Sequence, residues 1–317
     1  MKNMNNIKLT GKGKKAAKYL TAWALALIFI LSAGLTVFAA DTVVKNEKAQ
    51  IDFSDTNDTG TVKINILAKT DKRIKVVVKK LDEPKKDTTY NYDLNSDAKI
   101  ESYPLQWGNG EYSVKVMIQA AEPTKYTTGL SATFKLEIKK ENENAPFMYA
   151  NQLVNFNKDS KVVKKAAELT KNCATELDKV EAIYKFVIEN LVYDTKKAET
   201  VQTGYVPFVD GIVDAGKGIC FDYAAVFAAM LRSQGIPAKL VMGYVKNPDP
   251  KAKEPVYHAW NEFYLKDKGG WFKINEMKFD GKKFERIDPT FDSSSKGSKA
   301  AMQFIGDGSN YQKSQEF

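Results

Sequence analysis

The sequence contains few reactive side chains: two cysteines and one histidine among 317 residues. Its carboxylates do not combine with cysteine or histidine at the spacings of metal ligands, so the sequence predicts no metal ion and no cofactor. The chain also lacks the skewed composition of a disordered or collagen-like protein, and it lacks the repeated long apolar runs of a polytopic membrane protein. The composition is that of an ordinary globular protein, and the length suggests about two domains.

Charge is unevenly distributed along the chain. Lysine and arginine number 48 against 39 aspartates and glutamates, but residues 1–40 hold six lysines and no acid. The remaining residues therefore carry 42 bases against 39 acids, which is a small surplus. Because nucleic-acid binding needs a concentrated basic surface, we expect no nucleic-acid partner.

The first 40 residues have the pattern of a secretory signal peptide. Lysines precede an apolar run, 19–31, and small residues lead to Ala39. Cleavage after Ala39 would put Val37 and Ala39 at the two positions that the peptidase reads. An uncleaved anchor is the alternative, because 19–40 is uncharged and long enough to span a bilayer. Either way we expect an extracellular protein, secreted after cleavage or held to the membrane only through this segment.

Between residues 41 and 140 the apolar residues recur with a period of two, as in β-strands. The alternation is clearest in 61–67, 74–79, 111–118 and 133–138. About six or seven short strands in this length predict an antiparallel sandwich of immunoglobulin-like size, with a role in spacing or docking. A charged, apolar-poor stretch follows, and we interpret 141–152 as a linker.

The period changes after the linker, and 153–295 is predicted to be a second domain. Amphipathic helices are expected at 160–169 and 175–187, with Cys173 as an ordinary thiol between them. The last stretch, 296–317, is polar with isolated aromatic residues. We interpret it as a C-terminal tail that is either packed on the domain or mobile.

Cys220 lies where a helix is expected to begin. Gly216 and Gly218 precede it, and an alanine-rich segment follows and ends at Gly235. In the first turn the unpaired backbone N–H groups and the helix dipole favour a thiolate, although Asp222 in the same turn slightly opposes it. Taken alone, such a cysteine is more often a small buried residue than a nucleophile.

The only histidine, His258, lies in a stretch, 256–265, whose alternation predicts a strand. One face of this strand carries His258, Trp260, Glu262 and Tyr264. A lone histidine is usually structural, but a cysteine nucleophile needs a base for its proton, and the base needs an acceptor to fix its tautomer. If Cys220 is catalytic, His258 has to be its partner, and Asp288, at a predicted strand end, is a suitable orienter.

Three motifs occur in order: Gly-Ile-Cys-Phe-Asp-Tyr-Ala at 218–224, His-Ala-Trp-Asn-Glu at 258–262 and Asp-Pro-Thr at 288–290. This order resembles the bacterial transglutaminase-like core, which belongs to the papain-like group of cysteine acyl-transfer folds, and the resemblance covers about residues 150–295. It implies an α+β domain in which a helix-borne cysteine packs against an antiparallel sheet that carries His and then Asp. It also implies that Cys220 is the nucleophile, His258 the general base and acid, and Asp288 the orienter.

The resemblance further implies an oxyanion donor besides the backbone N–H of Cys220. Tyr193, Gln202 and Tyr205 are the candidates, and Trp260 is expected to wall the cleft or to pack the sheet. The chain departs from the simplest pattern of the family at 275–283, where an added hairpin with a turn at Asp280 and Gly281 could narrow the substrate cleft.

The predicted function is an exported Cys-His-Asp enzyme that acts on carboxamide or amide bonds of a protein or peptide through a thioester. Water as the acceptor gives hydrolysis by a protease, amidase or deamidase, whereas a lysine amine gives a transglutaminase-type cross-link. The sequence leaves this choice open. The long basic start of the signal segment points to a Gram-positive source.

Two alternatives stand beside the enzyme. The chain could be a non-enzymatic cell-surface binding module whose transglutaminase-like domain is inactive. Export would also permit a disulfide between Cys173 and Cys220, which would silence the nucleophile.

Overall fold

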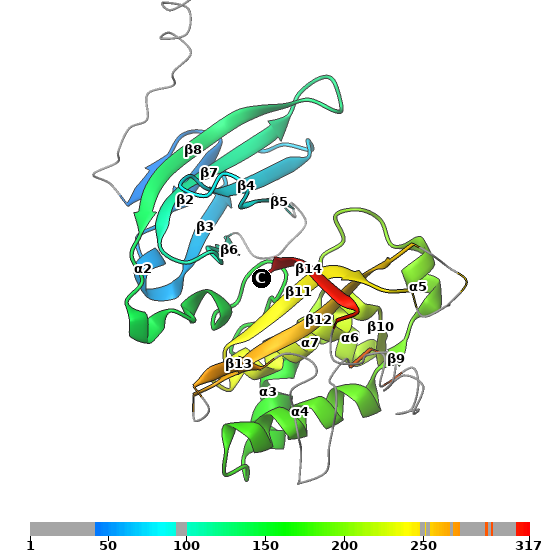
Figure 1. Ribbon diagram of the computed structural model, residues 1–317. Coiled ribbons are helices and arrows are strands. Elements are labelled where there is room, and N and C mark those ends of the chain that lie inside the picture. Colours follow the sequence, from blue (N-terminus) through cyan, green and yellow to red (C-terminus); the bar gives the residue numbers. More distant parts are fainter. Residues whose placement is uncertain are drawn as a thin grey trace, which may run out of the picture. The chain divides into compact units, whose positions relative to one another are not determined.

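The computed structural model describes residues 42–92, 100–247, 251, 254–266, 269–272, 289–290, 293 and 309–317. These residues belong to one compact unit, Ala39–Phe317 (Figure 1). The predicted signal peptide, 1–40, lies outside the described residues. Within the described part of the chain, no helix has the length and the apolar character needed to cross a membrane.

The front half contains two four-stranded antiparallel sheets, with strand orders β1-β2-β3-β6 and β5-β4-β7-β8. The first sheet consists of β1 (Val43–Lys45), β2 (Ala49–Asp52), β3 (Thr61–Ile66) and β6 (Glu101–Pro104). The second consists of β4 (Ile74–Lys80), β5 (Asp87–Asn91), β7 (Gly110–Gln119) and β8 (Tyr126–Leu136). A one-turn helix, α2 (Thr56–Thr59), connects β2 to β3. Each of the four stretches with clear alternation therefore falls on a strand.

Alternation along the strands produces one apolar layer between the two sheets. In β4 every second residue is buried. Phe53, just after β2, stacks on Phe134 of β8 with ring centroids 4.5 Å apart. Tyr90 of β5 packs edge-on against Tyr103 of β6 at 4.8 Å. Aromatic rings from opposite sheets thus fill the space between them.

The segment interpreted as a linker, 141–152, is structured. It contains most of the short 3-10 helix η1 (Lys140–Asn142) and all of η2 (Ala145–Phe147), and the side chains of η2 are buried. Further along, Asn151 and Gln152 are also buried. The Gln152 amide donates to the carboxylate of Glu101 over 2.9 Å, which ties this segment to the first sheet.

The back half begins with the two expected amphipathic helices, α3 (Lys161–Thr170) and α4 (Glu176–Asn190). A side chain–backbone capping box formed by Thr175 and Asp178 begins α4. The shorter elements that follow are β9 (Val192–Tyr193), α5 (Thr195–Thr200), α6 (Val209–Ala215) and β10 (Lys217–Gly218). β9 and β10 pair in parallel, which brings the end of α4 next to the residues that precede Cys220.

Helix α7 (Cys220–Ser233) is the centre of the back half. Its residues from Asp222 to Arg232 are all buried. On one side it packs against β11 (Ala238–Val245) and β12 (Val256–Leu265), which are antiparallel, and α3 and α4 also contact it (Figure 1). The expected α+β arrangement, a cysteine-bearing helix on an antiparallel sheet, is confirmed.

The core sheet has the strand order β13-β12-β11-β14, where β13 is Gly270–Phe272 and β14 is Tyr311–Glu316. β14 lies in the stretch interpreted as a tail, so residues 311–316 are a strand of the core sheet. Its pairing with β11 shifts register between Met242 and Gly243. At Gly243 the backbone of β14 approaches so closely that a Cβ would overlap the carbonyl oxygen of Gln312.

Arg232 joins three separate parts of the chain near the end of α7. Its side chain is buried, and the guanidinium donates to the backbone carbonyls of Ala238 (2.8 Å), Tyr149 (2.8 Å) and Phe317 (2.7 Å). These carbonyls belong to the start of β11, the segment before α3 and the residue that follows β14. A planar group with several donors is suited to this position, because each buried carbonyl needs a partner.

We expect Gly243→Ala to lower the free energy of unfolding by about 2–4 kcal/mol, because overpacking here displaces β14. The added Cβ would also lie 2.9 Å from the ring of Trp260. Gly270→Ala is the matched control, since a Cβ there meets nothing within 4 Å, and its effect should stay below about 0.5 kcal/mol. Urea denaturation measures both variants, and equal effects would contradict the close approach of β14.

Candidate active site

Glycine is required at each of two positions before Cys220, but for a different structural reason. Gly216 adopts a left-handed conformation, with φ of 62°, and ends α6. Gly218 has no such conformation, but a Cβ there would lie 2.6 Å from the Cβ of Asp222 and 2.9 Å from its Oδ2. The glycine therefore leaves room for the Asp222 side chain to fold back over the start of the helix.

Cys220 is the first residue of α7, as expected. Asp222, two residues later, accepts a hydrogen bond from the backbone N–H of Ile219 over 2.9 Å. This bond fixes the approach of the chain to the helix, as a carboxylate in the first helical turn commonly does. Cys220 is consequently held at the end of the helix where the backbone N–H groups have no partners within the helix.

The carboxylate of Asp222 is completely buried, and two further groups neutralise and satisfy it. Lys197 of α5 places its ammonium 2.6 Å from Oδ2. The hydroxyl of Tyr205 donates to Oδ1 over 2.6 Å. Burial, together with the bond to Asp222, raises the pKa of Tyr205 well above its usual value, so the hydroxyl keeps its proton. The negative charge of Asp222 is thus paired with the Lys197 cation.

His258 lies in β12, opposite Gly243 of β11. Its ring is buried and lies nearly parallel to that of Trp260, with centroids 6.3 Å apart. Tyr311 of β14 packs edge-on against Trp260 at 5.2 Å and contacts His258 from the same side. Because Tyr311 belongs to β14, the strand within the segment interpreted as a C-terminal tail helps to hold the imidazole.

The neighbouring side chains of β12 show that its two faces differ. Asn261 donates to the carbonyl of Ala224 in α7 over 2.9 Å. Glu262 points to the other side, where it accepts from Lys313 of β14 over 3.0 Å. The alternation predicted for this strand is therefore present in its contacts.

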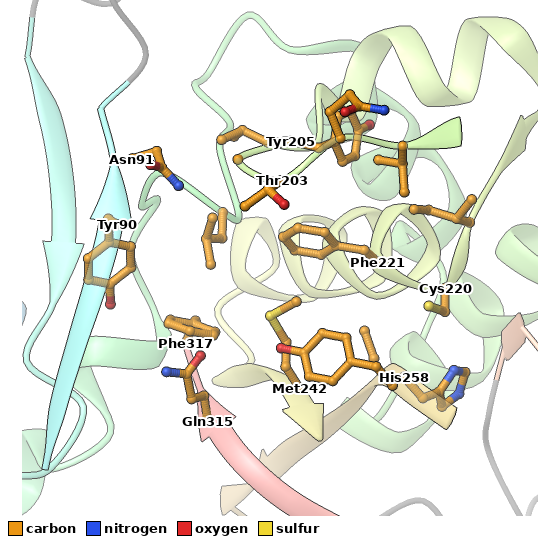
Figure 2. Close-up of a pocket in the computed structure, with 18 of the residues that line it drawn as sticks. Tyr90, Asn91, Thr203, Tyr205, Cys220, Phe221, Met242, His258, Gln315 and Phe317 are labelled. Atoms are coloured by element: carbon orange, nitrogen blue, oxygen red, sulfur yellow. The ribbon is translucent and has the colours of Figure 1, made fainter. Parts of the chain in front are cut away.

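A cavity of about 670 Å³ is lined by both Cys220 and His258. Figure 2 shows the two side chains at the same end of this cavity, with Cys220 at the start of its helix and His258 on its strand. Tyr257, next to His258, also lines the cavity, and burial together with Tyr244 and Cys220 raises the pKa of its hydroxyl. The single histidine of the chain and the helix-borne cysteine thus face one space.

The predicted oxyanion candidates all line the cavity, but their polar groups differ in what they bind. The Tyr205 hydroxyl donates to Asp222, and the Gln202 amide donates to the backbone carbonyl of Thr200 over 2.9 Å. Tyr193 lies in β9, paired with Gly218. Trp260 is not among the described lining residues and instead packs the sheet behind His258, which was one of the two expectations for it.

Asp288 and the predicted hairpin at 275–283 lie outside the described residues. The chain just after Asp288 is partly described. Ser293 donates to the carbonyl of Leu191 over 2.7 Å and shares a hydrogen bond of 2.9 Å with the hydroxyl of Tyr223. Tyr223 belongs to the first turn of α7, so Ser293 lies beside the helix that carries Cys220.

The second cysteine is separate from this site. Cys173 lies between α3 and α4, both cysteines are free thiols, and burial raises the pKa of the Cys173 thiol. Within the residues that the structure describes, no three histidine, cysteine or carboxylate side chains are grouped as they would be around a metal ion.

Sequence reasoning did not find several residues of the site. Lys197 lies in an ordinary charged run, and nothing in that run indicates a partner 25 residues downstream. The lining residues of β5 and of β14 come from segments interpreted as a separate sandwich and as a tail. In contrast to these residues, Asp222 could be recognised from the sequence, because its spacing from Cys220 places it in the same helical turn.

Residues 163–275, which include Cys220 and His258, match the core of the Transglutaminase-like superfamily. Residues 163–275 form a transglutaminase-like core. The matched span runs from α3 to just after β13, so it contains α7 together with β11 and β12. It ends before Asp288.

Other proteins are similar over parts of the chain. An uncharacterized protein of Bacillus subtilis (strain 168), YebA, is 26% identical over 156 residues, which are 45% of this chain and 21% of that protein. The chain thus spans about a fifth of that relative's length.

Among solved structures, a Cytophaga hutchinsonii protein provisionally assigned as a cysteine protease is 14% identical, with a TM-score of 0.39 over 81% of this chain and 83% of that one. Red sea bream transglutaminase is 11% identical, with a TM-score of 0.32 over 87% of this chain and 56% of that one.

In the transglutaminase-like core, we expect Lys197→Met to lower the free energy of unfolding by about 3 kcal/mol, because it leaves a buried carboxylate without a cation. Adding Asp222→Asn should recover most of that loss, since the amide removes the buried charge and keeps an acceptor. Lys196→Met is the matched control on the same helix and should have little effect. Urea denaturation of the unchanged protein and the three variants measures these free energies. A double variant no more stable than Lys197→Met would contradict the pairing of Lys197 with Asp222.

Proposed function

We propose that this chain is an exported cysteine acyl-transfer enzyme that uses Cys220 as nucleophile, His258 as general base and acid, and Asp288 as the group that orients the imidazole. The observation that supports this most directly is that Cys220, at the start of a buried helix, and the only histidine line the same cavity. The match of residues 163–275, a span that contains Cys220 and His258, to the transglutaminase-like core also supports the proposal.

In the proposed reaction His258 accepts the proton of the Cys220 thiol, and the thiolate attacks the carbonyl carbon of a carboxamide or peptide bond. The tetrahedral intermediate collapses to a thioester when His258 returns the proton to the departing ammonia or amine. Water or a primary amine then attacks the thioester and gives a proton to His258. The acyl group leaves with the acceptor, and the thiol of Cys220 is restored.

The negative oxygen of the intermediate needs hydrogen-bond donors. Backbone N–H groups in the first turn of α7 are suited to this, because helical geometry leaves them without intrahelical partners and the helix dipole is positive there. The bond between Asp222 and the Ile219 N–H keeps this turn in place. Tyr193 and Gln202 remain side-chain candidates for a second donor, whereas the Tyr205 hydroxyl is engaged by Asp222.

The role of Asp288 is supported by the chain around it. Ser293, five residues downstream, binds Tyr223 in the first turn of α7. Thr290 is buried. We propose that Asp288 supplies a carboxylate to the imidazole, because such a carboxylate would hold the tautomer that accepts a proton from sulfur.

We also propose that the front half is an immunoglobulin-like sandwich and that the chain acts at the cell surface. Two sheets with four strands each, in the orders given above, support the sandwich. A further feature is Tyr112 near the start of β7, whose hydroxyl donates to the carbonyl of Gly108 over 2.8 Å, as in the tyrosine corner of such domains. The secretory pattern of 1–40 supports export.

The decisive measurement is the rate at which iodoacetamide labels Cys220 between pH 5 and 9, mapped by mass spectrometry. We expect labelling at pH 6 to be at least about tenfold faster than that of a free thiol, whose pKa is about 8.5. His258→Ala should abolish this advantage, because the imidazole takes the thiol proton. Cys173→Ala is the control that leaves the rate unchanged.

A glutamine peptide offered with and without a primary amine then separates the two reactions. Ammonia release without incorporation of the amine indicates hydrolysis, and incorporation indicates transfer. If Cys220 labels no faster than a free thiol and His258→Ala changes nothing, the proposed enzyme is wrong and a binding module takes its place.

A further inference from the structure

The front half of the chain contributes a wall to the cavity that contains Cys220. Thr88, Thr89, Tyr90 and Asn91, all from β5, line it together with residues from the transglutaminase-like core. Figure 2 shows Tyr90 and Asn91 on one side of the cavity and Cys220 and His258 on the other. A molecule held at the sulfur therefore meets the sandwich strand across the same space.

Specific contacts hold this wall in place. The amide of Gln152 donates to the backbone carbonyl of Asn91 over 2.5 Å. The ring of Tyr90 packs edge-on against Phe317, which follows β14, at 5.7 Å. The Asn91 side chain also lies against the loop after α5, where its Nδ2 would be 3.3 Å from a Cβ at Gly204. Three independent segments thus position β5 at the cavity.

The described residues of the lining carry few charges. Aspartate, glutamate, lysine and arginine make up 27% of the chain, yet none occurs among the 24 described residues that line the cavity. The polar groups there are mainly neutral amides and hydroxyls, and the rest are apolar or aromatic. Val201, Val256 and Tyr257 are lining residues whose side chains are also exposed to solvent, which is a feature of surfaces that bind apolar groups.

A charged side chain in such a space would lose water and gain no ionic partner from these residues, which is unfavourable. A neutral peptide segment loses less, because its backbone can bond to amides such as Asn91, Gln152 and Gln315 while its apolar side chains contact the rings. The described lining residues thus favour uncharged over charged groups.

We propose, resting on the function proposed above, that the cavity selects acyl donors whose residues next to the reacting carbonyl are uncharged and apolar, and that β5 of the front half helps to set this specificity through Asn91. The front half is in this view part of the substrate site in addition to any role in spacing or docking. Asn91 is a specificity-determining residue and takes no part in the bond-making steps.

The test uses dipeptide amides that carry one neutral reactive group, a chloroacetyl cap, so that the chemistry at sulfur is constant. Chloroacetyl-Phe-Leu-amide is compared with the Phe-Asp and Phe-Lys versions, on the full chain with Cys173→Ala, where Cys220 is the only thiol. Each labelling rate is divided by the rate of the same reagent with 2-mercaptoethanol. We expect the Leu reagent to be at least about tenfold faster than both charged reagents.

Charges placed on the wall should change this order. Asn91→Asp should raise the rate of the Lys reagent relative to the Leu reagent by about fivefold, and Asn91→Lys should do so for the Asp reagent. Thr89→Asp and Thr89→Lys, at an exposed lining position of the same strand, repeat the experiment if an Asn91 variant does not fold. Asn65→Asp and Asn65→Lys, in β3 of the other sheet and absent from the described lining, are the matched controls and should change nothing.

The outcomes separate this proposal from the one it rests on. If all three reagents label Cys220 no faster than 2-mercaptoethanol, the proposed catalytic function fails. If Cys220 is activated but the three reagents react at equal relative rates, the function stands and selection against charge is overturned. If the reagents differ but the β5 variants behave like the Asn65 controls, the role of β5 is overturned.

Discussion

A single buried carboxylate binds groups from three parts of the chain. Asp222 accepts from the backbone before Cys220, from Lys197 of α5 and from Tyr205 in the following loop. The first bond fixes the beginning of the nucleophile helix, and the other two fix a wall of the cavity. Because a buried charge is unfavourable unless it is fully paired, all three partners have to be present at once. The position of the cysteine and the shape of the space in front of it are therefore coupled.

Much of this arrangement could be predicted from the sequence, since it depends on neighbours along the chain. A period of two identified the strands around β3, β4, β7 and β8, and helical spacing identified α3 and α4. The start of α7 was predictable because glycines, a cysteine and a capping carboxylate follow one another. The pairing of Cys220 with His258 was predicted from the order of the motifs, and the matched core contains both residues.

The remainder could not be predicted because it depends on contacts between distant segments. Lys197 binds Asp222 in a region where two short strands, β9 and β10, pair with each other. The end of the polar segment 296–317 has no strong alternation, and it forms a strand because β11 presents a free edge with a glycine at the point of closest approach. Likewise, β5 alternates between buried and more exposed residues as other strands of the front half do. Its place at the cavity follows from Gln152 and Phe317, which lie far away in sequence.

The pairing of β14 with β11 also bears on when the site becomes complete. A chain is synthesised from its N-terminus, so α7, β11 and β12 are available well before β14, the last strand of their sheet. Until β14 joins, Trp260 and His258 lack Tyr311 beside them, and the cavity lacks Gln315 and Phe317. The pairing of β14 with β11 therefore completes both the surroundings of the imidazole and one wall of the cavity.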